Sequence, residues 1–201
     1  GVVSFRILPN GSLARLNSAP IRGMRGCHLC TDEEDKYVFV SGYHDGKTTV
    51  LSLNPDGSVG KIVDGVFDRG YGSVAERNFR PHVNCVNITP DQKYLCAVDL
   101  GVDQVKIYKF NDETGKITLV DMLRCELESA PRIIKFSPDG RFAYLICELK
   151  NYISVYSYKD GPRGPVFELV QTISTLNEYH SKGSAACVLR FSRDWNYVLC
   201  S

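Results

Sequence analysis

Two segments of the chain follow the same plan, and they decide the fold. The first reads RPHVNCVNITPDQKYLCAVD at residues 80–99, and the second reads APRIIKFSPDGRFAYLICE at residues 130–148. Each has a proline before a short apolar run, then a turn of the Thr-Pro-Asp or Ser-Pro-Asp-Gly kind, then a second apolar run ending in a carboxylate. Short apolar runs separated by turn residues predict pairs of antiparallel strands. One structural unit is therefore written twice.

The turn, followed by an aromatic residue and an apolar strand, occurs four times in the chain. The repeat length is roughly 50 residues, and the aromatic anchors are Tyr37, Tyr94, Phe142 and Tyr197. The two clearest repeats each hold four strand patterns, at 82–88, 94–98, 104–110 and 117–122, and at 132–137, 142–147, 152–158 and 166–173. No segment shows a convincing helical pattern. Repeats of this length made only of strands predict an all-β fold, a β-propeller of four-stranded antiparallel blades.

The repeat boundaries predict one propeller domain with blades of unequal completeness. The expected division is a partial blade at 1–22, blades at 23–79, 80–129 and 130–180, and a partial blade at 181–201. The chain then amounts to about four blade-equivalents, and we expect it to be a fragment of a longer propeller. A long loop between blades is expected at 65–79, and such loops are usually functional or disordered.

Composition and charge exclude several classes of protein. The chain has 24 Lys and Arg against 23 Asp and Glu, a net charge of +1, and no basic block. This balance predicts neither nucleic-acid nor membrane binding. No apolar run approaches the length of a membrane span and no signal-like start is present, which favours the cytoplasm. Most of the eight cysteines lie in apolar runs, so reduced, buried thiols are expected rather than disulfides.

Ionisable residues lie at the ends of the expected strands. His82 and Arg132 open first strands, whereas Asp99 and Glu148 close second strands. Neighbouring strands of a meander are antiparallel, so the start of a first strand and the end of a second lie at the same end of the sheet. We therefore expect all four side chains at one rim of the central channel.

An imidazole, a carboxylate and a guanidinium at a channel mouth suit hydrolysis or proton transfer on an anionic substrate. His82 can take a proton from water near neutral pH, Glu148 can orient that water, and Arg132 can bind a carboxylate or phosphate. In the alternative interpretation, Arg132 and Glu148 form an ion pair between strands and His82 is a loop residue. The residue types alone leave both interpretations open.

Two further motifs are weaker. Tyr43 ends an earlier second strand at the same rim, where it can pack or contact a substrate. Cys27 and Cys30 have the two-residue spacing of a metal or redox motif, but no second pair follows. Positions three apart in a strand face opposite sides, so both sulfurs cannot easily hold one metal. No metal site is predicted.

The motif series RPHVN at 80–84, DLGVD at 99–103, APR at 130–132 and CEL at 147–149 resembles the lactonase family of seven-bladed propellers, which includes the bacterial 6-phosphogluconolactonases. The resemblance covers nearly the whole chain. It implies seven blades, about three of them absent here. It also implies hydrolysis of a sugar-acid lactone without metal or organic cofactor, typically 6-phosphogluconolactone in the pentose phosphate pathway.

The resemblance assigns the catalytic residues to His82, Arg132 and Glu148. Asp99, Asn84 and Tyr43 are expected to bind the substrate, a small anionic lactone. Asn84 stands where many relatives carry a second histidine, so this chain departs from a two-histidine mechanism.

Two other functions stay open. The same fold family contains cycloisomerases that close carboxymuconate into a lactone with similar residues. A non-catalytic propeller that displays its loops to a protein partner is the other alternative, although the repeats lack the Gly-His and Trp-Asp signature of WD-type blades. A severed propeller would leave strand edges unpaired, so we also expect self-association through open blade edges.

Overall fold

A computed structural model of the protein describes residues 1–72, 79–177 and 183–201. In these ranges three sheets have four strands each and two sheets have two strands each. The four-stranded sheets contain β3 (Gly26–Thr31), β4 (Tyr37–Gly42), β5 (Lys47–Leu53) and β6 (Val59–Phe67); β7 (Val83–Ile88), β8 (Tyr94–Asp99), β9 (Gln104–Phe110) and β10 (Ile117–Arg124); and β11 (Pro131–Phe136), β12 (Phe142–Cys147), β13 (Tyr152–Gly161) and β14 (Gly164–Ser174). The two-stranded sheets contain β1 (Val2–Ile7) and β2 (Leu13–Ala19), and β15 (Leu189–Phe191) and β16 (Val198–Cys200).

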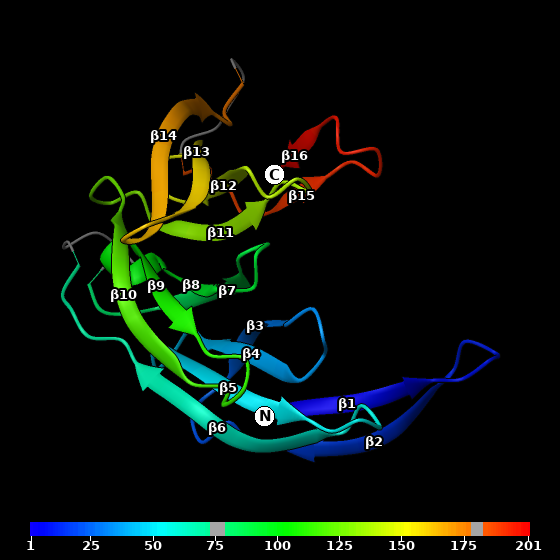
Figure 1. The fold of residues 1–201 in the computed structure, drawn as a ribbon. Helices are drawn as coiled ribbons and strands as arrows, with labels where there is room; N and C mark the ends of the chain where they lie inside the picture. The colour runs from blue at the N-terminus through cyan, green and yellow to red at the C-terminus, as the bar shows by residue number, and fades with distance from the viewer. Residues whose placement is uncertain (73–78, 178–182) are drawn as a thin grey trace.

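The sheets follow one another around an arc. Within each sheet the strands pair in chain order and are antiparallel. The first strands β3, β7, β11 and β15 lie on the concave side of the arc, and the last strands β6, β10 and β14 lie on its outer side (Figure 1). This arrangement is that of consecutive propeller blades, and the predicted all-β fold class is confirmed.

The core lies between successive sheets. One buried cluster joins β7–β10 to β11–β14 and contains Cys96, Val98, Ile107, Ile134 and Leu145. A second cluster joins β3–β6 to β7–β10 in the same way. Every residue of β4 and of β8 is buried, because a blade packs on both faces of these central strands. The apolar second strands seen in the sequence therefore fix the spacing of the blades.

The strand positions agree with the sequence patterns to within a few residues, with three differences. β6 extends to Phe67, so the loop expected at 65–79 begins later, and residues 73–78 of that loop lie outside the described residues. Leu100–Val102 form one turn of 3₁₀ helix where none was predicted. In the partial blade expected at 181–201, the first strand, β15, has only three residues.

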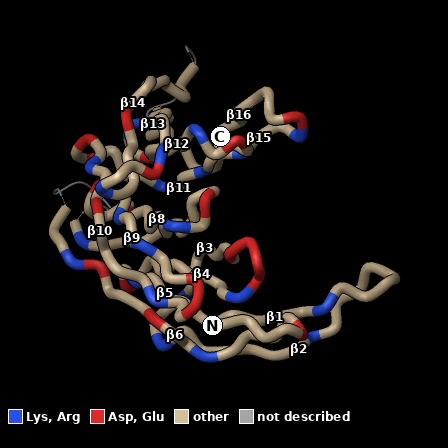
Figure 2. Tube along the Cα trace, viewed as in Figure 1, with Lys and Arg blue, Asp and Glu red and all other residues tan. Residues whose placement is uncertain are grey.

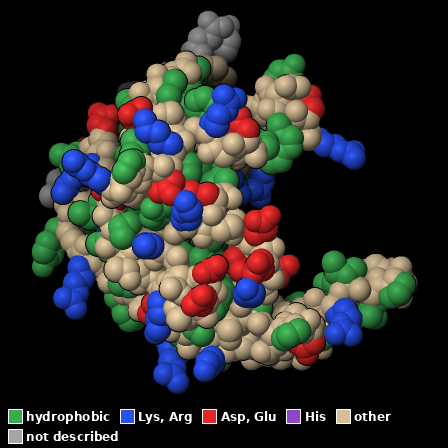
Figure 3. Space-filling view, in the orientation of Figure 1, with side chains coloured by type: hydrophobic (Ala, Val, Ile, Leu, Met, Phe, Trp, Pro, Cys, Tyr) green, Lys and Arg blue, Asp and Glu red, His purple; other side chains and the backbone are tan. Residues whose placement is uncertain are grey.

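The concave side of the arc is open, and acidic residues of one loop lie on it. Acidic residues of the loop that joins β3 to β4, residues 32–35, lie on this side (Figure 2). In the space-filling view the concave side is a recess bounded by the β15–β16 hairpin and the β1–β2 hairpin (Figure 3). No helix among the described residues is long and apolar enough to cross a membrane.

Candidate active site

Three consecutive first strands carry a β-bulge at equivalent positions. In β3, Gly26 pairs with Gly42 and the next pair begins at His28, which leaves Cys27 as the extra residue. The same shift occurs in β7 after Val83 and in β11 after Pro131. The extra residues there are Asn84 and Arg132. A bulge bends the strand and redirects a side chain, and bulges are frequent next to active sites.

The three bulge residues line one cavity. Its volume is about 420 Å³, and its walls are formed by Arg25, Gly26, Cys27, Tyr43, His44, Asn84 and Arg132. We call it the rim cavity. Asn84 Nδ2 donates to the Arg132 carbonyl at 3.1 Å, so the bulges of neighbouring blades are joined directly. Two guanidinium groups, an amide, a phenol and an imidazole therefore surround a space large enough for a small polar ligand.

Arg132 and Glu148 form an ion pair and a hydrogen bond through Arg132 Nη1 and Glu148 Oε2. Glu148 directly follows β12, and its backbone amide donates to the Ala130 carbonyl at 2.8 Å. The Glu148 side chain is 1% exposed and that of Arg132 is 28% exposed. The buried carboxylate therefore holds the guanidinium at the cavity wall. The ion pair of the alternative interpretation is present, and one of its members also lines the cavity.

His82 is held next to the rim cavity by Tyr43. Its Nδ1 donates to the Tyr43 carbonyl at 2.8 Å, and the two rings stack with centroids 4.3 Å apart. A carbonyl can only accept, so the neutral imidazole carries its proton on Nδ1 and leaves Nε2 as a base. Burial lowers the pKa of His82, which keeps the ring neutral near pH 7. His82 is 4% exposed and lies behind Tyr43, not in the wall itself.

Asp99 supports the backbone next to His82. It is completely buried, and its Oδ1 accepts from the His82 amide at 2.7 Å and from the Gly101 amide at 3.0 Å. Burial and the neighbouring Asp68 carboxylate raise the pKa of Asp99 to about 7. A carboxyl with no exposed surface and two backbone partners is placed to position the His82 segment. The contact between Asp99 and substrate that the sequence led us to expect does not fit this burial.

Gly101 allows two segments to approach closely. A Cβ atom at this position would lie 1.7 Å from the Arg80 carbonyl oxygen and 2.9 Å from His82 Cδ2. Only a glycine fits there without a shift of the backbone. The Asp-Leu-Gly sequence at 99–101 thus supplies both the carboxylate that accepts from the His82 amide and the space in which the imidazole lies.

The structure brings the six sequence candidates into one region, but in different roles. Tyr43, Asn84 and Arg132 line the rim cavity; Glu148 pairs with Arg132; His82 packs behind Tyr43; and Asp99 lies below His82. His82 and Arg132 each follow a proline at the start of a first strand, but they do not occupy equivalent positions of the repeat. The Leu100 amide donates to the His82 carbonyl, and the Glu148 amide donates to the Ala130 carbonyl in the same way. Ala130 is therefore the equivalent of His82. By the same register, Asn84 is the equivalent of Arg132.

Arg25 and Cys27 also line the cavity, and the sequence interpretation missed both as site residues. Cys27 was considered only as half of a two-cysteine motif, whereas here it is the bulge residue of β3. Aligning the three first strands on their aromatic anchors places Cys27 with Asn84 and Arg132, and Arg25 with His82. That alignment could have found both residues. Within the described ranges no group of three His, Cys, Asp or Glu side chains could hold a metal ion.

Comparisons with known proteins agree with this architecture. The family described as "Lactonase, 7-bladed beta-propeller" matches residues 1–201. The 6-phosphogluconolactonase of Bacillus subtilis is 31% identical over 199 residues, which cover 98% of this chain and 56% of the relative. The periplasmic gluconolactonase of Pseudomonas aeruginosa superimposes with a TM-score of 0.84 at 27% identity, covering 98% of this chain and 56% of that one.

A protein from Lactobacillus plantarum superimposes with a TM-score of 0.88 at 27% identity, covering all of this chain and 57% of that one. The chain thus spans a little over half the length of these relatives. The match to the family extends over every residue, from the β1–β2 hairpin to the β15–β16 hairpin, and includes the blades that carry the rim cavity. The chain belongs to the lactonase family of seven-bladed β-propellers.

Proposed function

We propose that the protein hydrolyses an anionic sugar-acid lactone bound in the rim cavity. One observation carries the proposal: bulges in three neighbouring blades direct side chains into a single cavity, beside which a neutral imidazole and a buried carboxylate–guanidinium pair are held in place. A scaffold that only displays loops has no need of such a convergence. The comparisons support the proposal through relatives that bear the names of lactone hydrolases.

The proposed mechanism uses His82 as the base. Its Nε2 takes a proton from water while the water oxygen bonds to the lactone carbonyl carbon. The ring C–O bond then breaks, and the proton passes to the departing ring oxygen, which becomes a hydroxyl group. His82 stacks on Tyr43 and does not line the cavity, so this mechanism requires a water molecule to reach Nε2 past Tyr43. Arg132, oriented by Glu148, stabilises the negative charge that develops on the carbonyl oxygen.

Two guanidinium groups in one cavity favour a substrate with a second negative group. With Arg132 near the reacting carbonyl, Arg25, which precedes β3 on the far side of the β7–β10 sheet, is available for a phosphate. We therefore propose 6-phosphogluconolactone as the substrate, with a place in the pentose phosphate pathway in the cytoplasm. The name of the Bacillus subtilis relative supports this choice, whereas the Pseudomonas aeruginosa relative is named as a periplasmic gluconolactonase.

The test compares 6-phosphogluconolactone with unphosphorylated gluconolactone as substrates of the full-length protein. We expect hydrolysis of the phosphorylated lactone well above its spontaneous rate. Arg25→Ala should raise KM for the phosphorylated lactone by about 10-fold and change KM for gluconolactone little. No excess over spontaneous hydrolysis with either lactone would refute the proposal. Turnover of a carboxymuconate instead would identify the cycloisomerase alternative.

His82 and His44 provide a matched pair of imidazoles. His44 lines the rim cavity and is exposed, whereas His82 is buried behind Tyr43. His82→Ala should lower kcat by about 100-fold or more because the base is lost, and His44→Ala should change mainly KM. The reverse result would transfer the role of base to His44.

A further inference from the structure

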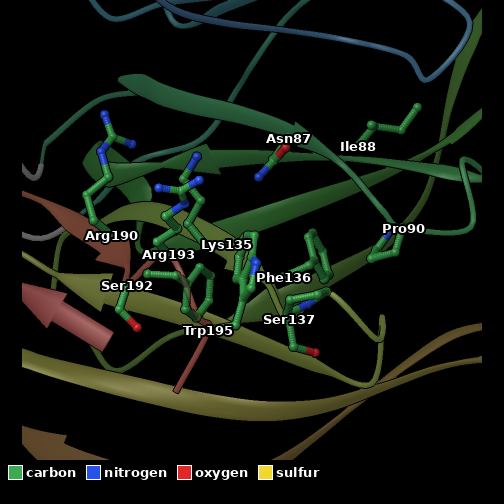
Figure 4. Close-up of a pocket in the computed structure, with 12 residues that line it drawn as sticks. Asn87, Ile88, Pro90, Lys135, Phe136, Ser137, Arg190, Ser192, Arg193 and Trp195 are labelled. Atoms are coloured by element: carbon green, nitrogen blue, oxygen red, sulfur yellow. The ribbon is translucent and has the colours of Figure 1, made fainter. Parts of the chain in front are cut away.

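A second cavity lies at the other end of the first strands. Its volume is about 610 Å³, and it extends between β7, β11, β15 and the hairpin loops that follow β11 and β15. We call it the basal cavity. Figure 4 shows the side chains of Lys135, Arg190 and Arg193 gathered on one side of it, with the rings of Trp195 and Phe136 beside them. None of these residues belongs to the rim cavity.

Polar side chains from three blades reach the basal cavity from the same position in the repeat. In each blade this residue of the first strand pairs with the second-strand residue that lies two positions after the aromatic anchor. The three residues at this position are Asn87, Lys135 and Arg190. The repeat therefore delivers three hydrogen-bond donors to one place, in the same way that the bulges deliver side chains to the rim cavity. Arg193 adds a further cation from the β15–β16 loop.

The positive charge of the basal cavity is not neutralised by the described residues. No Asp or Glu lines it, and in the ranges 1–72, 79–177 and 183–201 no carboxylate is paired with Lys135, Arg190 or Arg193. The effect extends to His28, whose pKa is lowered by burial and further by the charges of Lys135 and Arg190. A concave surface of one charge attracts ligands of the opposite charge.

Trp195 gives the basal cavity an aromatic surface from the β15–β16 turn. It has a φ of 62°, and its amide donates to the Ser192 carbonyl at 3.0 Å. The equivalent position of the β11–β12 turn is Gly140, with a φ of 71° and the same hydrogen bond. The β3–β4 and β7–β8 turns hold Asp35 and Gln92 at this position, also with positive φ, so among these four turns Trp195 alone offers an aromatic ring. The indole is 54% exposed, so a ligand can stack on it.

We propose that the basal cavity binds a nucleotide, that is, a small molecule with at least two phosphate charges and a planar ring. The guanidinium groups of Arg190 and Arg193 and the Lys135 ammonium match the phosphates. The indole of Trp195 offers a face to the ring. The indole packs on the Phe191 ring, with centroids 5.1 Å apart, and is still 54% exposed; an inorganic anion or a sugar phosphate would use the cations but leave this exposed indole surface uncontacted. The volume lies in the usual range of small-molecule sites.

The test is calorimetric titration of the full-length protein with ADP, pyrophosphate and adenosine. We expect ADP to bind more tightly than pyrophosphate, and adenosine to bind most weakly. The double variant Arg190→Ala, Arg193→Ala should weaken ADP binding by at least about 10-fold. Arg163→Ala removes an exposed guanidinium from the β13–β14 loop, outside the cavity, and is the matched control; it should change the affinity less than about twofold.

Trp195→Ala measures the contribution of the nucleotide ring to binding separately from that of the phosphates. It should weaken ADP binding by about 10-fold and leave pyrophosphate binding unchanged. If the wild type does not bind ADP at millimolar concentration, or if Arg163→Ala weakens ADP binding as much as the double variant does, the site is refuted. Equal affinity for ADP and pyrophosphate, unchanged by Trp195→Ala, would refute the nucleotide class. Circular dichroism establishes folding of each variant, and lactone hydrolysis should be the same in all of them.

Discussion

The two sheets β7–β10 and β11–β14 have the same architecture, yet they place their acidic residues one position apart. Asp99 is the last residue of β8 and pairs with Val83, whereas Glu148 is the first residue after β12. Side chains alternate between faces along a strand, so a shift of one residue sends the two carboxylates in different directions. Asp99 accepts from backbone amides, and Glu148 binds the Arg132 guanidinium.

The difference between the two sheets shows how a repeat acquires distinct roles. The blade that supplies the imidazole uses its acid to fix the backbone around that imidazole. The next blade has Ala130 at the place of His82 and uses its acid to orient a guanidinium. A carboxylate therefore binds backbone amides in one blade and a guanidinium in the other. Equivalent residues of the two blades therefore provide matched variants.

The largest effect is expected for Glu148→Gln. The neutral amide keeps the shape but loses the charge that holds Arg132 at the rim cavity, so kcat/KM for the lactone should fall by about 100- to 1,000-fold. Asp99→Asn should lower it far less, because the amide oxygen still accepts from the two backbone amides. Steady-state kinetics with matched circular dichroism spectra measure both.

Glu168→Gln is the control for Glu148→Gln. Glu168 lies on β14 with its side chain 65% exposed, 3.7 Å from Lys159 Nζ, and its loss should leave kinetics unchanged. If Asp99→Asn proves as damaging to kcat/KM as Glu148→Gln, the division of roles between the two acids is wrong.

The next effect concerns stability and is expected for Gly101→Ala. The new Cβ would collide with the Arg80 carbonyl, so the backbone must shift, at a cost of about 2–3 kcal/mol in the free energy of unfolding. The equivalent residue of the next blade is Leu149, which follows Glu148 as Gly101 follows Leu100. Leu149→Ala should cost about 1 kcal/mol through lost burial alone. Urea unfolding measures both, and equal losses would show that the close approach at Gly101 is not specific to the histidine blade.

The sequence was sufficient for the fold and for the region of the site. Period-two apolar runs and a repeat near 50 residues determine the blades, because both are set by local pattern. The anchors Tyr94 and Phe142 could be aligned by eye. The bulges could not be predicted, because they arise from register between strands, and an extra residue such as Asn84 or Arg132 has no signature of its own. His82 and Arg132 were wrongly equated because each follows a proline; counting back from the aromatic anchors Tyr94 and Phe142 pairs His82 with Ala130 instead.

The burial and the partners of the two carboxylates also could not be predicted from the sequence. Asp99 and Glu148 both end apolar runs, and nothing local distinguishes the carboxylate that meets two amides from the one that meets a guanidinium. That difference depends on the neighbouring blade and on the Gly101 contact. The cationic position at Lys135 and Arg190 was overlooked because solvent-facing charges are common on strands. Only the arrangement of the sheets in an arc shows that the Lys135 and Arg190 side chains line one cavity.

A smaller effect is expected for the pH dependence of stability. The pKa of Asp99 is raised from 3.8 to about 7, so the folded state binds this proton more tightly than the unfolded chain does. The free energy of unfolding should therefore decrease as pH rises from about 4 to about 7 and level off above. Asp99→Asn should remove most of this decrease, measured by urea unfolding across that range. An unchanged pH dependence would mean that the Asp68, Asp99 and Lys106 group keeps its proton elsewhere.

The smallest effect is expected for Asn84, whose side chain joins the two bulges. Asn84→Ala removes the hydrogen bond from Nδ2 to the Arg132 carbonyl and should cost about 1 kcal/mol in stability. Because this bond also fixes the wall of the rim cavity, KM for the lactone should rise several-fold while kcat stays nearly constant. Asn87 provides the control three residues further along β7, where its Nδ2 makes the same kind of bond to the Ile134 carbonyl at 3.2 Å.

Asn87→Ala should therefore cost a similar free energy of unfolding without any change in KM, since Asn87 lines only the basal cavity. Comparing Asn84→Ala with Asn87→Ala separates the effect on stability from the effect on substrate binding. A side-chain amide that bridges neighbouring blades stabilises the propeller at either position, but only the amide at the bulge should change KM for the lactone. A rise in KM of the same size for both variants would mean that the bulge is an incidental irregularity of the strand and not the feature that builds the site.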